Sequence, residues 1–166
     1  ILAWIGSSGH LSAAPEVDGV TALRQAGSTL KPFLYQLALQ ERWLTAASLI
    51  DDSPLDLQTV SGLYVPQNYG TDFKGLVSLR SALGSSLNIP AVRTLEMVTP
   101  QRLRDRLVDL GLSRLVEDGD YYGYSLALGS ADVRLLDLTN AYRVLANGGL
   151  YSPPRYLLSD AMPLAR

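Results

Sequence analysis

Cysteine is absent from this sequence of 166 residues, and histidine and lysine are scarce. Without cysteine there can be neither a disulfide framework nor a thiolate metal site. The single histidine, His10, excludes a cluster of histidine ligands. It lies in a serine- and glycine-rich turn, where a solvated loop residue is a simpler interpretation than a member of a catalytic triad. The two lysines are Lys31 and Lys74, and arginine is the common cation.

The chain also lacks an excess of charge of one sign. Its 14 basic and 16 acidic residues leave a formal net charge of −2, and no basic block occurs. A nucleic-acid partner is therefore not expected. No apolar run reaches the roughly 18 residues of a membrane-spanning helix, and no signal peptide is visible. The length suits one domain or part of a larger one, with 47% hydrophobic residues to build a core.

Hydrophobic periodicity predicts a mainly helical chain. Apolar residues at three- and four-residue spacing indicate helices over residues 28–40, 44–50, 77–84, 91–98, 101–110 and 135–147. The apolar run of residues 1–5 predicts a buried strand, and a short extended segment is predicted over residues 125–129. Gly111 and Gly148 are expected to end the helices that precede them.

Ser28 and Lys31 form the first candidate site. Gly27 and Ser28 are typical of a tight turn and a helix N-cap, which would place Ser28 and Lys31 one turn apart on one helix face. A hydroxyl at a helix N-terminus meets unpaired N–H groups that favour the negative charge of acyl transfer, and the lysine amine could take its proton. The alternative is a cap beside a solvated lysine. A cation in the first turn opposes the helix dipole, which favours a functional role.

Ser86 and Asn88 form a second pair, in the connector before Pro90. A hydroxyl and a carboxamide two residues apart project the same way. The serine could relay a proton between a lysine and a leaving group, and the asparagine could hold the lysine and bind a substrate amide. Helix caps use the same residue types, and taken alone this pair favours a cap.

Taken together, Ser28-x-x-Lys31 and Ser86-x-Asn88 resemble the first two motifs of the penicillin-recognising serine acyltransferases. Residues 27–33, 64–69, 79–92 and segments between 126 and 149 are similar to the transpeptidase domain of class A, bifunctional penicillin-binding proteins, and residues 27–35 are most similar to their 1C branch. The resemblance implies an α+β fold with an antiparallel sheet flanked by helices and a helical subdomain. Residues 1–166 would be the N-terminal and central part of that domain.

The function that the resemblance implies is that of a peptidoglycan D,D-transpeptidase. Ser28 would attack the penultimate D-alanine carbonyl of a stem peptide, and Lys31 would be its general base. Ser86 would be the proton shuttle, and Asn88 a ligand of Lys31 and of the substrate amide. β-Lactams would acylate the same serine, and neither a metal nor an organic cofactor is needed. For Lys31 to act near neutral pH, its pKa must fall by roughly 3 pH units, which requires a desolvated site.

The sequence departs from the family at its third motif, Lys-Thr-Gly, which does not occur. We therefore expect an incomplete, mainly helical fragment whose later sheet strands lie outside residues 1–166. The resemblance further implies a full-length protein with a membrane anchor and a glycosyltransferase domain, at the periplasmic face of the bacterial cytoplasmic membrane. Its partners would be peptidoglycan stem peptides and β-lactam antibiotics.

Three alternatives to the transpeptidase stay open. A D,D-carboxypeptidase uses the same residues and differs only in transferring the acyl group to water. A serine β-lactamase shares the first two motifs but needs a base for deacylation, and the nearby carboxylate, Glu96, lacks the expected local pattern. The third alternative is a non-catalytic penicillin-binding or interaction module.

Overall fold

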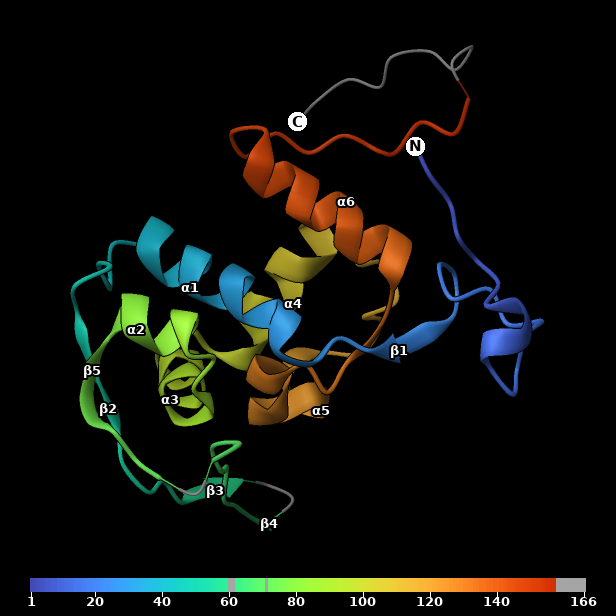
Figure 1. The fold of residues 1–166 in the computed structure, drawn as a ribbon. Helices are drawn as coiled ribbons and strands as arrows, with labels where there is room; N and C mark the ends of the chain where they lie inside the picture. Colours follow the sequence, from blue (N-terminus) through green and yellow to red (C-terminus); the bar gives the residue numbers. More distant parts are fainter. Residues whose placement is uncertain (60–61, 71, 158–166) are drawn as a thin grey trace. The chain divides into compact units, whose positions relative to one another are not determined.

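The computed structural model describes residues 1–59, 62–70 and 72–157 (Figure 1). The chain divides into two compact units. The first unit comprises Ile1–Gln25, Leu107–Val116 and the chain from Asp132 onward, and the second unit comprises Ala26–Arg106 and Glu117–Ala131. Ser28, Lys31, Ser86 and Asn88 all belong to the second unit.

Helices account for most of the regular structure in the described residues. The α-helices are α1 (Lys31–Gln40), α2 (Leu79–Gly84), α3 (Asn88–Val98), α4 (Pro100–Asp109), α5 (Gly119–Tyr122) and α6 (Leu135–Ala146). The 3₁₀-helices are η1 (Gly9–Leu11), η2 (Gly27–Leu30) and η3 (Gly123–Leu128). Within this described part, no helix has the length and apolar character needed to cross a bilayer.

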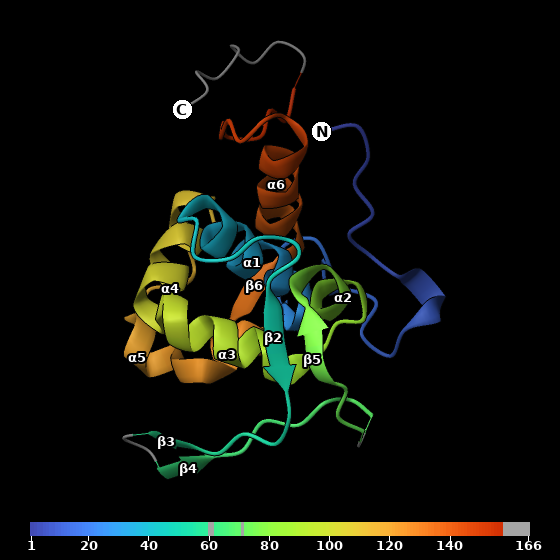
Figure 2. The same cartoon turned by 90° about the vertical axis from the view of Figure 1, so that its left-hand side faces the viewer.

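The strands of the described chain form three separate antiparallel pairs. The first pair joins β1 (Leu23–Gln25) to β6 (Asp132–Arg134). The second joins β2 (Leu49–Asp52) to β5 (Gly75–Ser78), and the third joins β3 (Leu57–Thr59) to β4 (Gly62–Tyr64). Figure 2 shows β2 and β5 side by side, next to α2 and α3.

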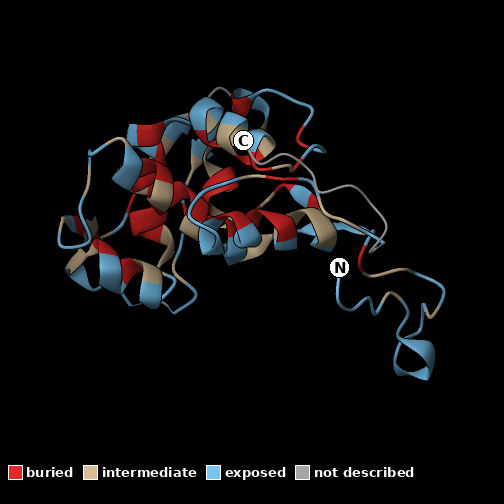
Figure 3. Cartoon of the chain, turned by 90° about the horizontal axis from the view of Figure 1, so that it is seen from above, coloured by how far each residue is buried: buried red, intermediate tan, exposed pale blue. Residues whose placement is uncertain are grey.

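The core of the second unit is built around α1. Phe33, Leu34 and Ala38 are fully buried, as the three- and four-residue spacing of apolar residues requires. Helix α1 packs on α3, and α3 packs on η3. Figure 3 shows buried and exposed residues alternating along the helices, while the loops are mostly exposed. Burial of each large apolar side chain stabilises the unit by about 2 kcal/mol.

The helices with the clearest periodicity agree with the sequence to within a few residues. Helix α1 ends at Gln40, and α4 and α6 lie within one residue of the expected bounds. Gly111 and Gly148 follow α4 and α6 with φ angles of 97° and 79°, in the left-handed region where glycine terminates a helix. Helix α3 begins three residues before the expected position, so Pro90 lies in its first turn, where no N–H partner is needed.

Residues 44–50 do not form the helix that their apolar spacing predicts. The chain turns after α1 and enters β2 at Leu49. Burial alternates along β2, with Ile50 and Asp52 buried, and Ile50 lies opposite Val77 of β5. A helix of seven residues is marginal on its own, so pairing with a strand far along the chain prevails over the local pattern. For the same reason α2 begins at Leu79 rather than 77.

Two other predictions were wrong. Residues 1–5 form no strand, and Leu2 and Ile5 are exposed. Their hydrophobic composition led to the expectation of burial, but no neighbouring strand pairs with them in the described chain. Residues 125–129 are not extended either, because Gly123–Leu128 is η3, whose Leu126 and Ala127 are buried.

Candidate active site

Ser28 lies on η2, the short turn that leads into α1. Gly27 starts the turn with a φ of 58°, and its N–H donates to the carbonyl of Gly129 at 3.0 Å. The N-cap position of η2 is Ala26, and the Lys31 N–H donates to the Ser28 carbonyl. The expectation that Ser28 caps the helix is therefore wrong. Ser28 is exposed and lies one turn before Lys31.

Lys31 is almost completely buried, with 1% of its surface exposed. Its Nζ donates to Asn88 Oδ1 at 2.6 Å, to the Ser86 carbonyl at 2.6 Å and to Ser86 Oγ at 3.2 Å. These three bonds match the three donors of an ammonium group. The structure thus joins three of the four residues that the sequence singled out, across a separation of 55 to 57 positions.

Burial lowers the pKa of Lys31 to about 8. The physical cause is desolvation, which penalises the charged form, and the hydrogen-bond partners of the amine are a carbonyl, a hydroxyl and a carboxamide rather than a carboxylate. The direction agrees with the sequence-based requirement, and the fall is slightly smaller than the roughly 3 pH units expected. At pH 7 about one amine in ten is then neutral.

Ser86 faces Lys31 because the chain turns sharply between α2 and α3. Its φ is 53°, a left-handed value that is rare for a residue with a side chain. The Ser86 N–H donates to the Leu83 carbonyl and the Leu87 N–H to the Ala82 carbonyl, both at 3.0 Å, so the end of α2 holds the turn. The turn directs the carbonyl and the hydroxyl of one residue at the same amine.

Asn88 is the first residue of α3. Its Oδ1 accepts from Lys31, and its Nδ2 donates to the Gln67 carbonyl at 2.7 Å. The carboxamide is therefore fixed at both ends, with its oxygen toward the lysine. Sequence analysis placed Asn88 in a connector, whereas the structure places it at the start of α3.

The Ser28 hydroxyl makes no hydrogen bond to Lys31 in the described chain. Sequence reasoning expected the amine within reach of this hydroxyl, whereas all three donors of Lys31 point to Ser86 and Asn88. Ser28 shares the η2–α1 segment with Lys31, which keeps the two residues one turn apart. Lys31, Ser86 and Asn88 thus form a hydrogen-bonded cluster. The exposed Ser28 precedes Lys31 in the same segment.

Two residues of this region were missed by sequence analysis. Asn68 accepts hydrogen bonds from the N–H groups of Asn88 and Ile89, and Asp52 accepts one from the Asn68 side chain. Asn68 lies in the segment 64–69 that carried part of the family resemblance, but neither residue was given a role, because local patterns do not reveal a partner 20 residues away. The described residues contain no group of three or more His, Cys, Asp or Glu side chains placed to hold a metal ion.

Comparison with known proteins assigns the family. The family model described as penicillin binding protein transpeptidase domain matches residues 15–161. The chain belongs to this family. It is a transpeptidase-domain sequence of the class A penicillin-binding proteins, and its helices with small antiparallel strand pairs have the α+β character expected of that fold.

The relatives of this transpeptidase sequence are much longer proteins. Penicillin-binding protein 1C of Escherichia coli K12 is 39% identical over 148 residues, which are 88% of this chain and 19% of that protein. The crystal structure of penicillin-binding protein 1A from Haemophilus influenzae superposes with a TM-score of 0.74 at 33% identity, covering 84% of this chain and 21% of that one. PonA1 of Mycobacterium tuberculosis in complex with penicillin V gives 0.69 at 29% identity, over 82% of this chain and 38% of that one. The chain spans about a fifth of the length of its E. coli relative.

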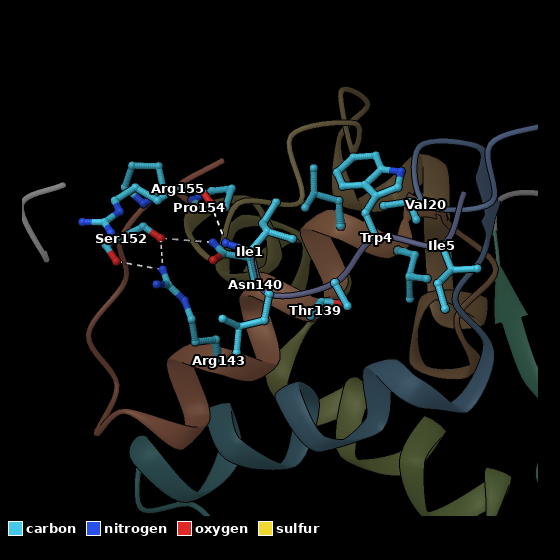
Figure 4. A pocket seen from close by; sticks show the side chains of 15 residues that line it. Ile1, Trp4, Ile5, Val20, Thr139, Asn140, Arg143, Ser152, Pro154 and Arg155 are labelled. Carbon is cyan, nitrogen blue, oxygen red and sulfur yellow. Dashed lines mark hydrogen bonds between the residues drawn. The ribbon is translucent and has the colours of Figure 1, made fainter. Parts of the chain in front are cut away.

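The first unit of the transpeptidase chain contains an apolar pocket of about 770 Å³ (Figure 4). Residues 1–5 and α6 supply much of its lining, together with residues 152–155. The Ile1 ammonium donates to the Arg155 carbonyl at 2.7 Å, and side chains of α6 donate to the Ser152 carbonyl. Neither Ser28 nor any residue of the Lys31 cluster lines this pocket, so the acyl-transfer chemistry is assigned to the Lys31 cluster and not to the pocket.

Proposed function

We propose that this domain is a peptidoglycan D,D-transpeptidase that works through an acyl-enzyme on Ser28. The observation that carries the proposal is the buried amine of Lys31, held by Ser86 and Asn88, with a pKa of about 8. A lysine at this pKa is neutral often enough to accept a proton near physiological pH. Membership of the penicillin-binding protein transpeptidase family supports the substrate class.

Acylation begins with loss of a proton from Lys31. A neutral amine keeps two N–H donors for its two short contacts, with the Ser86 carbonyl and Asn88 Oδ1. The longer contact, with Ser86 Oγ at 3.2 Å, is the one that is given up, and the lone pair becomes available to a hydroxyl. The Ser28 Oγ–H then transfers its proton to Lys31 as Oγ attacks the penultimate D-alanine carbonyl carbon.

The leaving group departs with the proton that Lys31 took up. The C–N bond to the terminal D-alanine breaks, and its amine receives a proton through the Ser86 hydroxyl, which in turn takes one from Lys31. Ser86 is suited to this relay because a hydroxyl both donates and accepts. Asn88 has one amide hydrogen left beyond its bond to Gln67, and this donor faces the substrate amide in our proposal.

The acyl group is then transferred to an amine from a neighbouring stem peptide. The incoming amine loses its proton to neutral Lys31, an amide forms, and the Ser28 Oγ–carbonyl bond breaks. Lys31 returns this proton to Ser28 Oγ, which restores the free hydroxyl and the neutral amine. Water in place of the amine would give a D,D-carboxypeptidase with the same residues. A β-lactamase is disfavoured, since the described hydrogen-bond partners of Lys31 include no carboxylate and Glu96 is exposed on α3.

The full-length protein, in the same proposal, is anchored at the periplasmic face of the bacterial cytoplasmic membrane and carries a glycosyltransferase domain. Its partners are peptidoglycan stem peptides and β-lactams. The remainder of the transpeptidase domain, with the Lys-Thr-Gly strand that binds the substrate carboxylate, lies outside residues 1–166. The solved complex of the related PonA1 protein with penicillin V supports the β-lactam assignment.

Covalent labelling tests the nucleophile. In the full-length protein, a fluorescent penicillin should label one peptide that contains Ser28, and Ser28→Ala should abolish the label. Ser85→Ala, which removes an exposed hydroxyl next to the cluster, is the matched control and should label normally. Undiminished labelling of Ser28→Ala would show that the nucleophile is elsewhere.

A further inference from the structure

Two side chains that touch neither Ser28 nor Lys31 hold the start of α3 in place. We propose that Asn68, oriented by the buried carboxylate of Asp52, is the positioning residue that sets Asn88 and through it the amine of Lys31 for acylation. This inference rests on the proposed function and adds a role that the motif residues themselves do not reveal.

The Asn68 carboxamide is used on both sides. Its Oδ1 accepts from the backbone N–H of Asn88 at 2.8 Å and of Ile89 at 3.3 Å, while its Nδ2 donates to Asp52 Oδ1 at 2.8 Å. Reversal of the amide would place NH₂ against two N–H donors, so the neighbours allow only one orientation. Asn68 therefore transmits a fixed geometry from Asp52 to α3.

Asp52 is a buried carboxylate without an ion pair among the described residues. It is 0% exposed at the end of β2, and its Oδ2 accepts from the Lys74 backbone N–H at 2.9 Å. Burying a carboxylate costs free energy, and a position that only needed a hydrogen-bond partner could use a neutral amide. The carboxylate has one property that an amide lacks: both its oxygens accept. It thereby compels Asn68 to present its donor side to Asp52 and its oxygen to α3.

Helix α3 depends on this contact because it has no local cap. Its N-cap residue is Leu87, whose side chain cannot accept a hydrogen bond, so the first N–H groups would be unsatisfied without Asn68. The neighbouring Gln67 carbonyl accepts from the Asn88 side chain at 2.7 Å. Two consecutive residues of one loop thus hold the backbone and the carboxamide of Asn88, whose oxygen holds Lys31.

A small displacement of Asn88 would also displace the amine of Lys31. The contact between Lys31 Nζ and Asn88 Oδ1 is short, at 2.6 Å. Misplacement of a catalytic group by about 1 Å can cost on the order of 100-fold in rate. The loss should appear in the acylation step more than in the binding of the penicillin, because the displacement reaches the amine that takes up the Ser28 proton.

Exchanging the two side chains tests the proposal in the full-length protein. Asn68→Asp alone sets two carboxylates face to face, and Asp52→Asn alone leaves one amide that must meet an N–H on one side and Asn68 on the other. The double variant Asp52→Asn/Asn68→Asp regains the contacts that join position 52 to α3: the new amide donates to the new carboxylate, which accepts from both N–H groups of α3. It loses only the 3.5 Å bond from the Asn68 amide to the Asp72 carbonyl. Acylation by a fluorescent penicillin over a range of concentrations separates the rate constant of acylation from the binding constant.

We expect each single variant to lower the acylation rate constant by about 10- to 100-fold with binding changed less than about threefold, and the double variant to return to within about fivefold of the natural protein. Asp118→Ala, which removes the cap of α5, is the control for loss of a helix cap elsewhere in the second unit and should keep the natural rate constant. A merely structural role would lower the melting temperature and the labelled fraction but leave the rate constant of the labelled molecules unchanged.

The outcomes are decisive in each case. A double variant as slow as the slower single variant, or one that does not fold, overturns the positioning role, because the exchange keeps the hydrogen bonds that join position 52, position 68 and the start of α3. If a single variant does not fold, the double variant alone decides. Failure of the proposed function has a different signature, since Ser28→Ala would then label as well as the natural protein.

Discussion

The amine of Lys31 lies 2.6 Å from the side-chain oxygen of Asn88, a residue 57 positions later in the chain. With the carbonyl and hydroxyl of Ser86 it completes a set of neutral acceptors around a buried amine. A carboxylate at this place would stabilise the ammonium and raise the pKa of Lys31, whereas neutral acceptors orient the amine and leave the desolvation penalty in force. The pair thus combines close placement with a lowered pKa, as a general base requires.

Replacing Lys31 by arginine should remove the base while keeping the positive charge. A guanidinium is not deprotonated in proteins, so Lys31→Arg should lower the rate of acylation by a fluorescent penicillin about 100- to 10,000-fold, the contribution typical of general acid–base catalysis. Lys74→Arg, at an exposed lysine, is the control and should react normally. Equal rates for the two variants would rule out Lys31 as the base.

The pH dependence of acylation should follow the Lys31 amine. With a pKa of about 8, the neutral base becomes about tenfold more abundant for each unit by which the pH rises toward that value, and it saturates above it. The second-order rate constant of acylation should therefore rise from pH 6 to about 8 and then level off. Stopped-flow or gel-based labelling across this range measures it. A rate constant that does not change between about pH 6 and 9 is incompatible with this assignment.

Stability should depend on pH through the same group. Because burial lowers the pKa of Lys31 from 10.5 to about 8 in the folded state, the unfolded chain binds more protons between these two values. Stability contributed by this group is therefore full above about pH 10.5 and is lost as the pH falls toward 8. Urea unfolding from about pH 7 to 10 should show this rise for the natural chain and not for Lys31→Met. Parallel curves would contradict it.

Two substitutions of Ser86 distinguish the effect of backbone strain on stability from the effect of losing the hydroxyl on acylation. Glycine tolerates a φ of 53° whereas alanine does not, so Ser86→Gly should be more stable than Ser86→Ala by about 1 kcal/mol. Both variants lack the hydroxyl that we assign to the proton relay, and both should lose acylation to the same extent, about 100-fold. Chemical denaturation and penicillin labelling of the pair measure the two effects. A faster acylation by the glycine variant would assign the loss to backbone geometry instead.

Gly129 should be sensitive to substitution because the turn before Ser28 lies directly against it. A Cβ at Gly129 would lie 2.0 Å from the Gly27 carbonyl oxygen, and its φ is 76°. Gly123 has a similar φ of 57° but open space around the Cβ position, which makes it a matched control. Gly129→Ala should cost more than about 3 kcal/mol of stability and Gly123→Ala about 1 kcal/mol. Similar melting temperatures for the two variants would show that the turn accommodates the added methyl group at little cost in stability.

The sequence by itself determined those features that depend on neighbouring residues. The apolar spacing of α1, α4 and α6, and the glycines at 111 and 148, identified the helices and their ends because one turn of helix and one stop signal are local properties. Ser28 and Lys31 were placed one turn apart for the same reason. The amino-acid sequence of longer segments, such as residues 27–33, 64–69 and 79–92, indicated the family before any contact was known.

Only the tertiary structure decided which distant segments meet. Residues 44–50 carry a helical pattern, yet β5 supplies backbone partners for β2 some 25 positions away, and no local pattern encodes that pairing. The contacts of Asn68 with Asp52 and α3 are of the same kind. Burial of Lys31, and with it the lowered pKa, arises when α1 packs on α3, because desolvation depends on what surrounds a side chain and not on its neighbours in sequence.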